Sequence, residues 1–453
     1  MSPTRTRADA PPLVVPPLGP VPRPKRLTAA ERTLPSGLTV LAVRRRSVPM
    51  VELRLRIPFQ GSAASHPARA ELLADSLLSG TEHRDRTDIA ATVQGLGGSL
   101  STSVDADRLL IAGSALAARL PEMLGLLSEV LTGATYPGAE VARDRSRLIE
   151  RLTMARSQAG TVAHEALATR LFGRHPYALD MPQPDAVAST TAAQVRRLHA
   201  ARVLPRGATL ILVGDIAPQR TLDRAEAALA SWAGTANASA APALPDIESG
   251  PLVLVDRPGS VQSAVRIGGP AVGRTHADAP PLSLANLVFG GYFSSRWVEN
   301  IREDKGYTYS PRSAVEHHVL GSVFTAAADV ATEVTAPALL ETQYELGRIA
   351  SLPVSDVEVD AVRQYAIGTL ALSVATQSGL ASTLSSLAGS GLGLDYLATQ
   401  PGRLAAVTTD EVSAAAAAYL APARLVTVIV GDAGQVSGPL AALGSLTTAA
   451  PAA

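Results

Sequence analysis

Hydrophobic positions along the chain follow strand-like and helix-like patterns in an order that predicts an α+β fold. Two strand-like runs, Leu38–Val43 and Val51–Ile57, flank a basic turn, and apolar and polar residues alternate in the second run. Alternation with a period of two is typical of a half-buried strand, so the pair predicts a β-hairpin. Helical segments follow, the first over about 67–78 and the longest over about 138–155, and a further strand covers 208–213.

The second half of the chain repeats this order. The strand that ends at Gly214 is matched by one that ends at Gly431, and in both cases Asp comes next; the offset is 431 − 214 = 217. Glu140 and Glu358, each before a long helix, are related by nearly the same offset, 358 − 140 = 218. These ordered matches indicate an internal duplication, and their period is too long for a solenoid. We therefore expect two homologous halves, each a mostly antiparallel sheet with helices on one face.

Composition indicates where these halves begin and end. One internal segment is rich in Ala, Ser, Pro and Gly without a hydrophobic period, which is typical of a linker. A Pro- and Arg-rich segment precedes the first strand, and an Ala- and Gly-rich segment follows the last helix. The predicted organisation is a flexible arm 1–30, an N-terminal half 31–233, a linker 234–250, a C-terminal half 251–440 and a flexible tail 441–453.

Charge and hydropathy argue against several classes of partner. Lys and Arg together number 40, as do Asp and Glu, so the net charge predicts neither nucleic-acid nor membrane-surface binding. No apolar run approaches the roughly 18 residues of a membrane span. The absence of cysteine excludes disulfides and thiolate metal ligands. The N-terminal arm lacks the apolar core of a secretory signal, so we expect a cytoplasmic protein.

The most informative stretch is 290–310, GGYFSSRWVENIREDKGYTYS. Paired glycines permit a tight turn, a helical run follows, and Gly306 is a plausible C-cap before the strand-like residues 307–310. Arg302 on the last turn and Tyr309 beyond the cap could therefore face a common space. A guanidinium and a phenol both donate hydrogen bonds, which suits the carbonyls of an extended peptide. The alternative is a helix-to-strand corner with an ordinary surface arginine.

This stretch resembles a segment in the second half of pitrilysin/insulinase-family peptidases, the inverted zinc peptidases. Family members carry a Gly-rich turn, an S-R-L-like helix start and R-E-x-x-G-x-x-Y. Here R-E-D-K-G-Y-T-Y places Arg302 and Tyr309 at the same spacing. The resemblance covers roughly residues 30 to 440. It implies two halves that face each other around a closed chamber, and it implies that Arg302 and Tyr309 bind the substrate backbone.

The same resemblance predicts where a zinc site would lie in the first half. In active members a helix carries H-x-x-E-H, whose histidines bind zinc and whose Glu activates water, and a later Glu is the third ligand. In this sequence the flanks of that helix match, but Glu71 and Asp75 replace the two histidines and Ala74 replaces the catalytic Glu. Arg151 replaces the third ligand. Glu150 lies one residue early, a rotation of about 100° on a helix.

The remaining carboxylates leave two interpretations open. Glu71 and Asp75 share a helix face, so a weak Mg²⁺ or Ca²⁺ site with Glu150 is conceivable. The favoured alternative is that both carboxylates are solvated or ion-paired with nearby arginines, Arg151 among them. An alanine cannot act as a general base, so we expect no catalytic residue, no metal ligand and no peptide hydrolysis by this chain alone.

Loss of the zinc positions together with retention of Arg302 and Tyr309 leads to a functional prediction. Some members of the family are heterodimers in which one subunit carries H-x-x-E-H and the other carries the Arg and Tyr. The chain is predicted to be the non-catalytic subunit of such a zinc metallopeptidase, with zinc bound by its homologous partner. The alternatives are a catalytically inactive scaffold subunit and a standalone peptide-binding protein, and a self-sufficient zinc peptidase ranks last.

Overall fold

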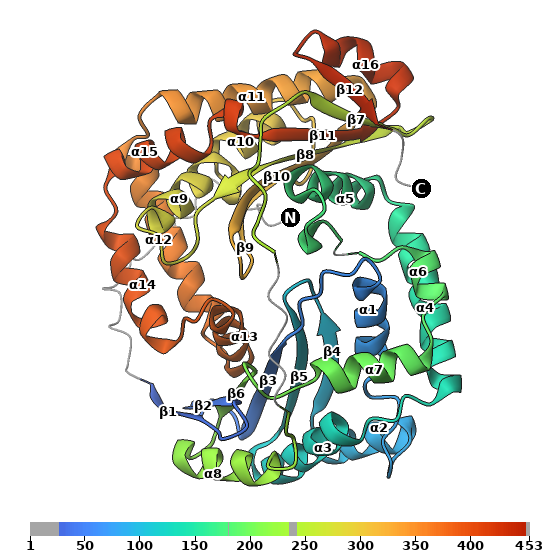
Figure 1. Ribbon diagram of the computed structural model, residues 1–453. Coiled ribbons are helices and arrows are strands. Elements are labelled where there is room, and N and C mark those ends of the chain that lie inside the picture. The colour runs from blue at the N-terminus through green and yellow to red at the C-terminus, as the bar shows by residue number, and fades with distance from the viewer. Residues whose placement is uncertain (1–26, 180, 235–241, 450–453) are drawn as a thin grey trace, which may run out of the picture.

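A computed structural model describes residues 27–179, 181–234 and 242–449. It contains two halves, and each half is built on one six-stranded sheet with the helices packed around it (Figure 1). The two sheets are mixed, because each combines antiparallel with parallel strand pairs. The α+β fold with two homologous halves is therefore confirmed, with the refinement that the sheets are mixed.

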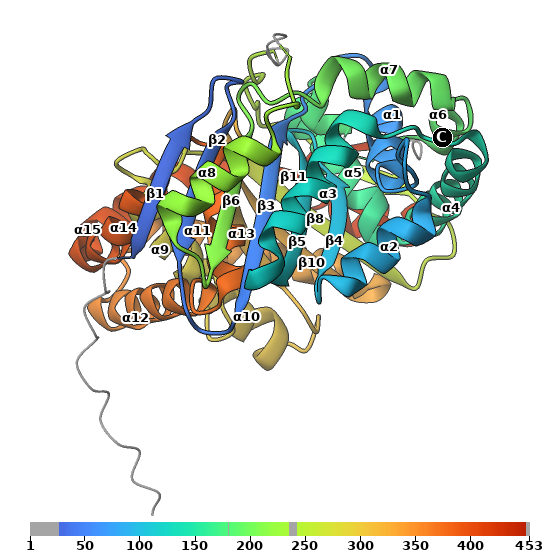
Figure 2. The same ribbon diagram turned by 90° about the horizontal axis from the view of Figure 1, so that it is seen from below.

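The N-terminal sheet has the strand order β1-β2-β6-β3-β5-β4, in which β2 and β6 are parallel and the other neighbours antiparallel. From below, α8 and α3 lie over the outer face of this sheet (Figure 2). Its strands are β1 (Thr28–Thr33), β2 (Thr39–Arg44), β3 (Met50–Pro58), β4 (Ser99–Val104), β5 (Arg108–Leu116) and β6 (Thr209–Gly214). The helices of this half are α1 (His66–Ser76), α2 (Arg86–Gly95), α3 (Leu120–Gly133), α4 (Gly138–Arg156), α5 (Ala159–Phe172), α6 (Pro184–Ala188), α7 (Ala192–Arg202) and α8 (Pro218–Ala228).

The C-terminal sheet has the strand order β12-β7-β11-β8-β10-β9, in which β7 is parallel to both of its neighbours. Its strands are β7 (Leu252–Asp256), β8 (Gln262–Ala271), β9 (Arg312–His317), β10 (Ser322–Ala331), β11 (Val426–Gly431) and β12 (Leu446–Ala449). The helices of this half are α9 (Ala279–Asn286), α10 (Arg296–Val298), α11 (Thr335–Ser351), α12 (Asp356–Ser373), α13 (Gln377–Ala388), α14 (Leu394–Ala406), α15 (Thr409–Tyr419) and α16 (Ala433–Ala441).

The duplication is visible in the topology and in one repeated ion pair. The order β2-β6-β3-β5-β4 in the first sheet corresponds to β7-β11-β8-β10-β9 in the second. In the first half, Nε of Arg86 lies 2.6 Å from the carboxylate of Glu140 at the start of α4. In the second half, Nε of Arg296 lies 2.6 Å from Glu358 at the start of α12. The two halves thus retain both the strand order and a specific contact between equivalent helices.

Each sheet is also covered by one helix from the opposite half. Helix α5 of the N-terminal half packs on β8 and β11, where its leucines meet valines of β11. Helix α13 of the C-terminal half packs on β3 and β6, where Leu380 and Leu384 meet Ile211 and Val213. The central strands are consequently buried on both faces, which explains why β6 and β11 are apolar runs without alternation.

The predicted hairpin between β2 and β3 is wrong. These strands do not pair, because β6 lies between them and pairs with both. The basic turn that joins them crosses the end of β6, where Arg45 N–H donates to the carbonyl of Gly214 and Arg46 contacts Asp215 at 2.9 Å. Strand β6 is buried on both faces, and such a strand takes a central position in a sheet. The alternation within β3 does not indicate that its partner is β6, which lies far away in the chain.

The ends of the halves differ in part from the prediction. Strand β1 begins at Thr28, inside the predicted arm, and β12, inside the predicted tail, pairs in parallel with β7. The described part of the predicted linker, 242–250, contains no helix or strand. The segments 1–26, 235–241 and 450–453 lie outside the described residues, so the expected flexibility there stays a prediction.

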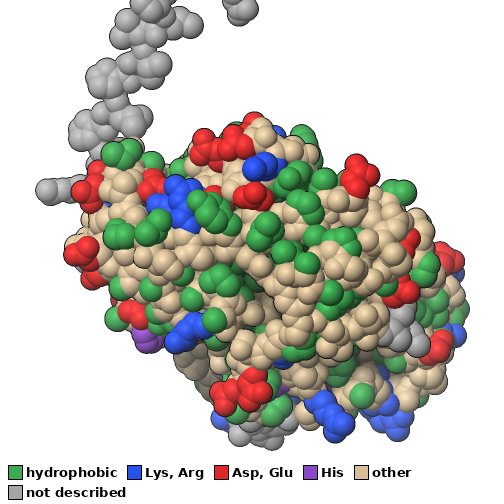
Figure 3. Space-filling model, turned by 90° about the horizontal axis from the view of Figure 1, so that it is seen from above, with side chains coloured by type: hydrophobic (Ala, Val, Ile, Leu, Met, Phe, Trp, Pro, Cys, Tyr) green, Lys and Arg blue, Asp and Glu red, His purple; other side chains and the backbone are tan. Residues whose placement is uncertain are grey.

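The surface and the helices agree with the balanced composition. Acidic and basic side chains are interspersed on the face viewed from above, and no single sign of charge dominates it (Figure 3). Within 27–179, 181–234 and 242–449, none of the helices combines the length and the apolar character that crossing a membrane requires.

Candidate substrate-binding site and degenerate metal site

The segment that carries Arg302 is anchored by buried aromatic packing. Trp297 on α10 stacks on Phe289 with ring centroids 5.2 Å apart, and its indole N–H donates to Thr342 at 2.9 Å. A π-helical turn over Glu299–Asp304 follows α10, and Ile301 at its centre is fully buried. Because Ile301 faces the core, the next side chain, Arg302, is directed towards the surface.

Gly306 ends this turn in the conformation that a C-cap needs. Its φ is +64°, the left-handed region that favours glycine, and its N–H donates to the carbonyl of Arg302 at 3.2 Å. The following residue, Tyr307, donates to the carbonyl of Ile301 at 2.8 Å. The predicted strand over 307–310 is absent, since β9 begins only at Arg312. The irregular backbone at these residues turns Tyr309 outward, where 82% of it is exposed.

Arg302 and Tyr309 lie together, and a third side chain joins them. The guanidinium carbon of Arg302 is 5.1 Å from the ring centroid of Tyr309 and 4.5 Å from that of Phe293. Nε of Arg302 also contacts the exposed carboxylate of Glu303 at 3.2 Å. Within the described ranges no acceptor is recorded for the terminal nitrogens of Arg302. Two aromatic rings therefore orient the cation while its outer N–H groups stay available.

Phe293 was not identified from the sequence. It lies in the Gly- and Ser-rich turn before α10, and it is 60% exposed. A large aromatic residue within a turn of small residues is the only local signal that could have singled it out. Its contact with Arg302 depends on the path of the chain through the turn, α10 and the π-helical turn, which the helical pattern does not describe.

The positions expected to hold zinc in the family form an internal ion-pair cluster instead. Glu71 and Asp75 lie on α1, and Arg151 reaches them from α4, with Nη2 at 3.5 Å from Glu71 and 3.1 Å from Asp75. Burial raises the pKa of Asp75, while the charge of Arg151 opposes that shift. Ala74 is buried, and its carbonyl accepts a hydrogen bond from Thr102 at 2.6 Å.

These residues do not fit a zinc ion. Zinc sites in proteins use histidine, cysteine or carboxylate ligands that converge on the metal, whereas here the guanidinium of Arg151 lies against both carboxylates. Glu150 is exposed, and no group of three or more His, Cys, Asp or Glu side chains within 27–179, 181–234 and 242–449 is arranged to hold a metal ion. A methyl group at residue 74 cannot accept a proton from water.

Comparisons with known proteins place the chain in a peptidase family. Residues 47–185 match the insulinase family, peptidase family M16, and residues 189–365 match the peptidase M16 inactive domain. An uncharacterized zinc protease of Streptomyces coelicolor is 24% identical over 404 residues, covering 86% of each chain. An uncharacterized zinc protease of Mycobacterium leprae is 24% identical over 292 residues, covering 63% of this chain and 65% of that protein.

Solved structures share the fold over nearly the whole chain. The crystal structure of a peptidase M16 inactive domain from Pseudomonas fluorescens has a TM-score of 0.83 and 23% identity, covering 90% of this chain and 98% of that one. A protease from Helicobacter pylori has a TM-score of 0.82 and 16% identity, covering 89% and 100%. The two family matches adjoin each other and together cover residues 47–185 and 189–365. The chain belongs to the M16, or insulinase, family of peptidases.

Proposed function

We propose that this protein is the non-catalytic subunit of a heterodimeric M16 zinc metallopeptidase and binds the peptide backbone of the substrate for a partner subunit that carries H-x-x-E-H. The observation that supports this function most strongly is the contrast between two arginines. Arg151 is paired with carboxylates at the position of a metal ligand, whereas Arg302 is stacked on exposed rings with outward N–H groups. The first arrangement does not suit a zinc ion, and the second suits a ligand with hydrogen-bond acceptors.

The chemistry of the pair matches an extended peptide. Peptide carbonyls accept hydrogen bonds, and both the guanidinium of Arg302 and the hydroxyl of Tyr309 can donate them. Contact with Phe293 and Tyr309 already restricts the guanidinium, so less side-chain freedom is lost when a peptide binds. Backbone contacts of this kind are independent of the peptide sequence, which suits a peptidase of broad specificity. The chain would also close the chamber around the partner's zinc.

The test is reconstitution with an H-x-x-E-H homologue from the same organism. Arg302→Ala should lower the kcat/KM of the pair about 10- to 100-fold, because a charge-assisted hydrogen bond contributes about 1.5–3 kcal/mol. Tyr309→Phe removes a neutral donor and should lower it about 3- to 10-fold. Arg220→Ala and Tyr344→Phe change exposed residues of the same types on α8 and α11 and should leave activity intact.

The outcomes separate the alternatives. Light scattering must show that all four variants still form a stoichiometric complex with the partner, because the proposed role is binding of substrate rather than assembly. Full activity of both Arg302→Ala and Tyr309→Phe would favour the inactive scaffold. Peptide affinity of the isolated chain without any stable partner would favour the standalone peptide-binding protein.

A further inference from the structure

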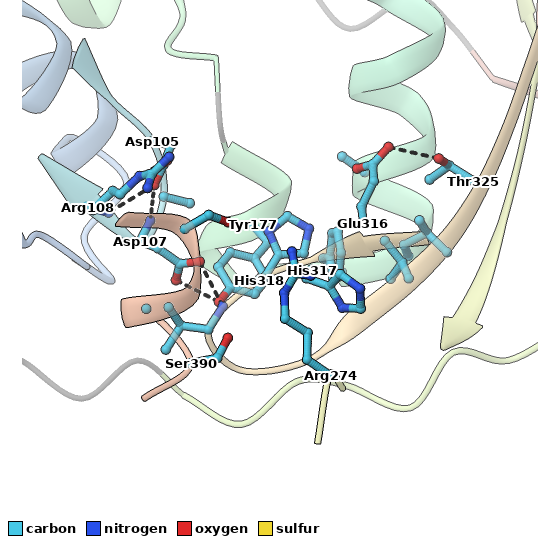
Figure 4. Close-up of a pocket in the computed structure, with 18 of the residues that line it drawn as sticks. Asp105, Asp107, Arg108, Tyr177, Arg274, Glu316, His317, His318, Thr325 and Ser390 are labelled. Carbon is cyan, nitrogen blue, oxygen red and sulfur yellow. Dashed lines mark hydrogen bonds and ion pairs between the residues drawn. The ribbon is translucent and has the colours of Figure 1, made fainter. Parts of the chain in front are cut away.

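A cavity of about 390 Å³ lies where the two halves meet. The turn between β4 and β5 borders it from the first half, and the turn between β9 and β10 borders it from the second (Figure 4). One hydrogen bond joins the two turns, from Val319 N–H to Asp107 at 2.9 Å, and Leu320 N–H donates to the hydroxyl of Tyr177, in the turn Pro176–Leu179, at 3.1 Å. Asp105 and Val319 at its edge are exposed, so the cavity communicates with solvent.

The acidic groups around this cavity already have partners. Asp107 accepts hydrogen bonds from the hydroxyl of Tyr177 at 2.7 Å and from the side-chain amide of Gln60 at 2.9 Å. The carboxylate of Asp105 is paired with Arg108 on the adjoining strand at 3.0 Å, and that of Glu316 accepts from the hydroxyl of Thr325 at 2.8 Å. Figure 4 shows the contacts with Tyr177, Arg108 and Thr325 as dashed lines.

Arg56 on β3 lines the same cavity and differs from these groups. Only 7% of it is exposed, and no hydrogen bond or ion pair to it is recorded within 27–179, 181–234 and 242–449. Its guanidinium lies against Gly389 at the end of α13, where a Cβ would come within 2.9 Å of Nη2. Burial and the neighbouring cation Arg108 lower the pKa of Arg56, while the charges of Asp107 and Asp105 oppose that shift. A buried cation without a hydrogen-bonded partner is unfavourable, because the attraction of these two carboxylates offsets its desolvation only in part.

Two other buried arginines show how this fold satisfies such a charge. Arg54, two positions away on β3 and 8% exposed, donates to Glu52, to Ser378 and Ser382 of α13, and to two backbone carbonyls. Arg266 on β8 donates to Asp329 and to two carbonyls of its own sheet. The lack of a recorded hydrogen-bond partner therefore distinguishes Arg56 from the other two buried arginines.

The strand registers show that the place of Arg56 is filled differently in the second half. Arg54 pairs with Ile211 and Arg266 with Val428, at the same offset of 428 − 211 = 217 that relates β6 to β11. By that register Arg56 corresponds to Gly268. A Cβ at Gly268 would lie 2.9 Å from Leu171 of α5, so apolar packing fills this place in the second half. In the first half the same place holds a cation and open volume.

The opposite side of the cavity adds a second cation and a neutral histidine. Arg274 and His317 lie side by side there (Figure 4). Burial lowers the pKa of Arg274, which has the hydroxyl of Tyr396 as its partner. Burial and the neighbouring cation Arg274 lower the pKa of His317 to about 4, so the imidazole is uncharged at neutral pH. Among the described residues that line this cavity, Arg56 and Arg274 are thus the cations that form no ion pair or hydrogen bond with a carboxylate.

We propose that this cavity binds the free carboxylate of a short peptide, with the carboxylate paired to Arg56. A planar carboxylate of charge −1 matches the guanidinium fork, whereas a phosphate would bring a second charge close to three acidic residues. The volume lies within the range of about 300–1,000 Å³ typical of small-ligand sites. The rest of the lining suits an apolar side chain and includes Leu167, Ala168, Leu171, Phe172, Val319 and Val323.

The experiment uses the isolated chain, so its result does not depend on the heterodimer. Titration calorimetry is performed with the tripeptide Ala-Val-Phe bearing a free carboxylate, with the C-terminal amide of that peptide, and with inorganic phosphate at equal ionic strength. The free acid should bind, and the amide should bind at least about tenfold more weakly, because it lacks the charge. Equal binding of acid and amide, binding of phosphate alone, or no binding of the acid would overturn the proposal.

Variants of the two neighbouring arginines test the role of Arg56 itself. Arg56→Met should raise the melting temperature of the ligand-free chain, because it removes an unpaired buried cation, and should abolish the peptide-induced rise. Arg54→Met should lower the melting temperature, because it removes the hydrogen bonds to Glu52 and to two backbone carbonyls. If Arg56→Met lowers the melting temperature as much as Arg54→Met does and retains binding of the peptide acid, then Arg56 is structural and the proposal fails.

Discussion

Each half of the molecule has an arginine at a position where the family has a site residue, and the surroundings of these two arginines are opposite in character. In the N-terminal half, Arg151 lies against Glu71 and Asp75, so its charge is balanced within the chain. In the C-terminal half, Arg302 lies against the rings of Phe293 and Tyr309, which orient a cation without neutralising it. The first arrangement uses the donor groups internally, and the second leaves them for a ligand. The two halves of one duplicated fold thus place an arginine in two different environments, one balanced within the chain and one open to a ligand.

The largest expected effect comes from removing the buried support of Arg302. Trp297→Ala deletes a side chain that stacks on Phe289 and donates to Thr342, and it should lower the free energy of unfolding by about 3–5 kcal/mol. Urea denaturation followed by circular dichroism measures this loss.

The matched change is Phe293→Ala, at an exposed ring that contacts the same arginine. It should alter the free energy of unfolding by no more than about 0.5 kcal/mol, yet lower the peptidase activity of the reconstituted pair. Equal destabilisation by the two variants would contradict the division between a buried support and an exposed binding surface.

A smaller effect is expected at the arginine–glutamate ion pair that is repeated in each half. The hydrogen bond from Arg296 is the main cause that lowers the pKa of Glu358 to about 2. A carboxylate with a lowered folded-state pKa stabilises the fold above its unfolded value, near 4.5, and loses that contribution as the pH falls towards 2. Because solvent partly screens this pair, Glu358→Gln should cost about 1–2 kcal/mol at pH 7, and the difference from wild type should shrink below pH 4.5.

The equivalent change in the first half is Glu140→Gln. It should cost less than Glu358→Gln, because Arg86 keeps a second carboxylate partner in Asp144. Urea denaturation of wild type and both variants between pH 7 and pH 3 tests the pair. A pH-independent difference for Glu358→Gln would show that the ion pair is not the source of the effect.

The smallest effect is expected at the ion-pair cluster of the first half. Arg151→Gln removes a cation whose side chain is mostly exposed, so the free energy of unfolding should fall by only about 0.2–1 kcal/mol. The pKa of Asp75 should rise further, because Arg151 now opposes the effect of burial, and carboxyl NMR titration would detect the change. No peptidase activity should appear. Hydrolysis by the isolated variant would contradict the assignment of Ala74 to the general-base position.

Local sequence signals predicted well that Arg302 and Tyr309 lie together, and their role in binding a substrate stays a prediction. The spacing of Arg302 and Tyr309 with Gly306 between them sufficed, because a capped helical turn and its next few residues form one compact unit. The match between Glu140 and Glu358 likewise identified the duplication, and both residues bind an equivalent arginine. These features depend on residues that are near in the chain or repeated at a constant offset.

The remaining features depend on contacts between distant segments. The place of β6 between β2 and β3 follows from burial on both of its faces, and that burial is supplied by α13 from the other half. Arg56 is covered by Gly389, which belongs to the other half of the chain and offers no side chain as a hydrogen-bond partner. No pattern within a window of helical or strand length contains this information.

The exchange of α5 and α13 between the halves has a consequence for the history of the chain. Before duplication, a single half would have left the second face of its sheet bare, and a second copy would have supplied the missing helix to each. Such an ancestor would be an obligate homodimer, with a stability that depended on protomer concentration. Fusion converted that bimolecular association into intramolecular folding. Either half expressed alone should therefore fold only by pairing with itself.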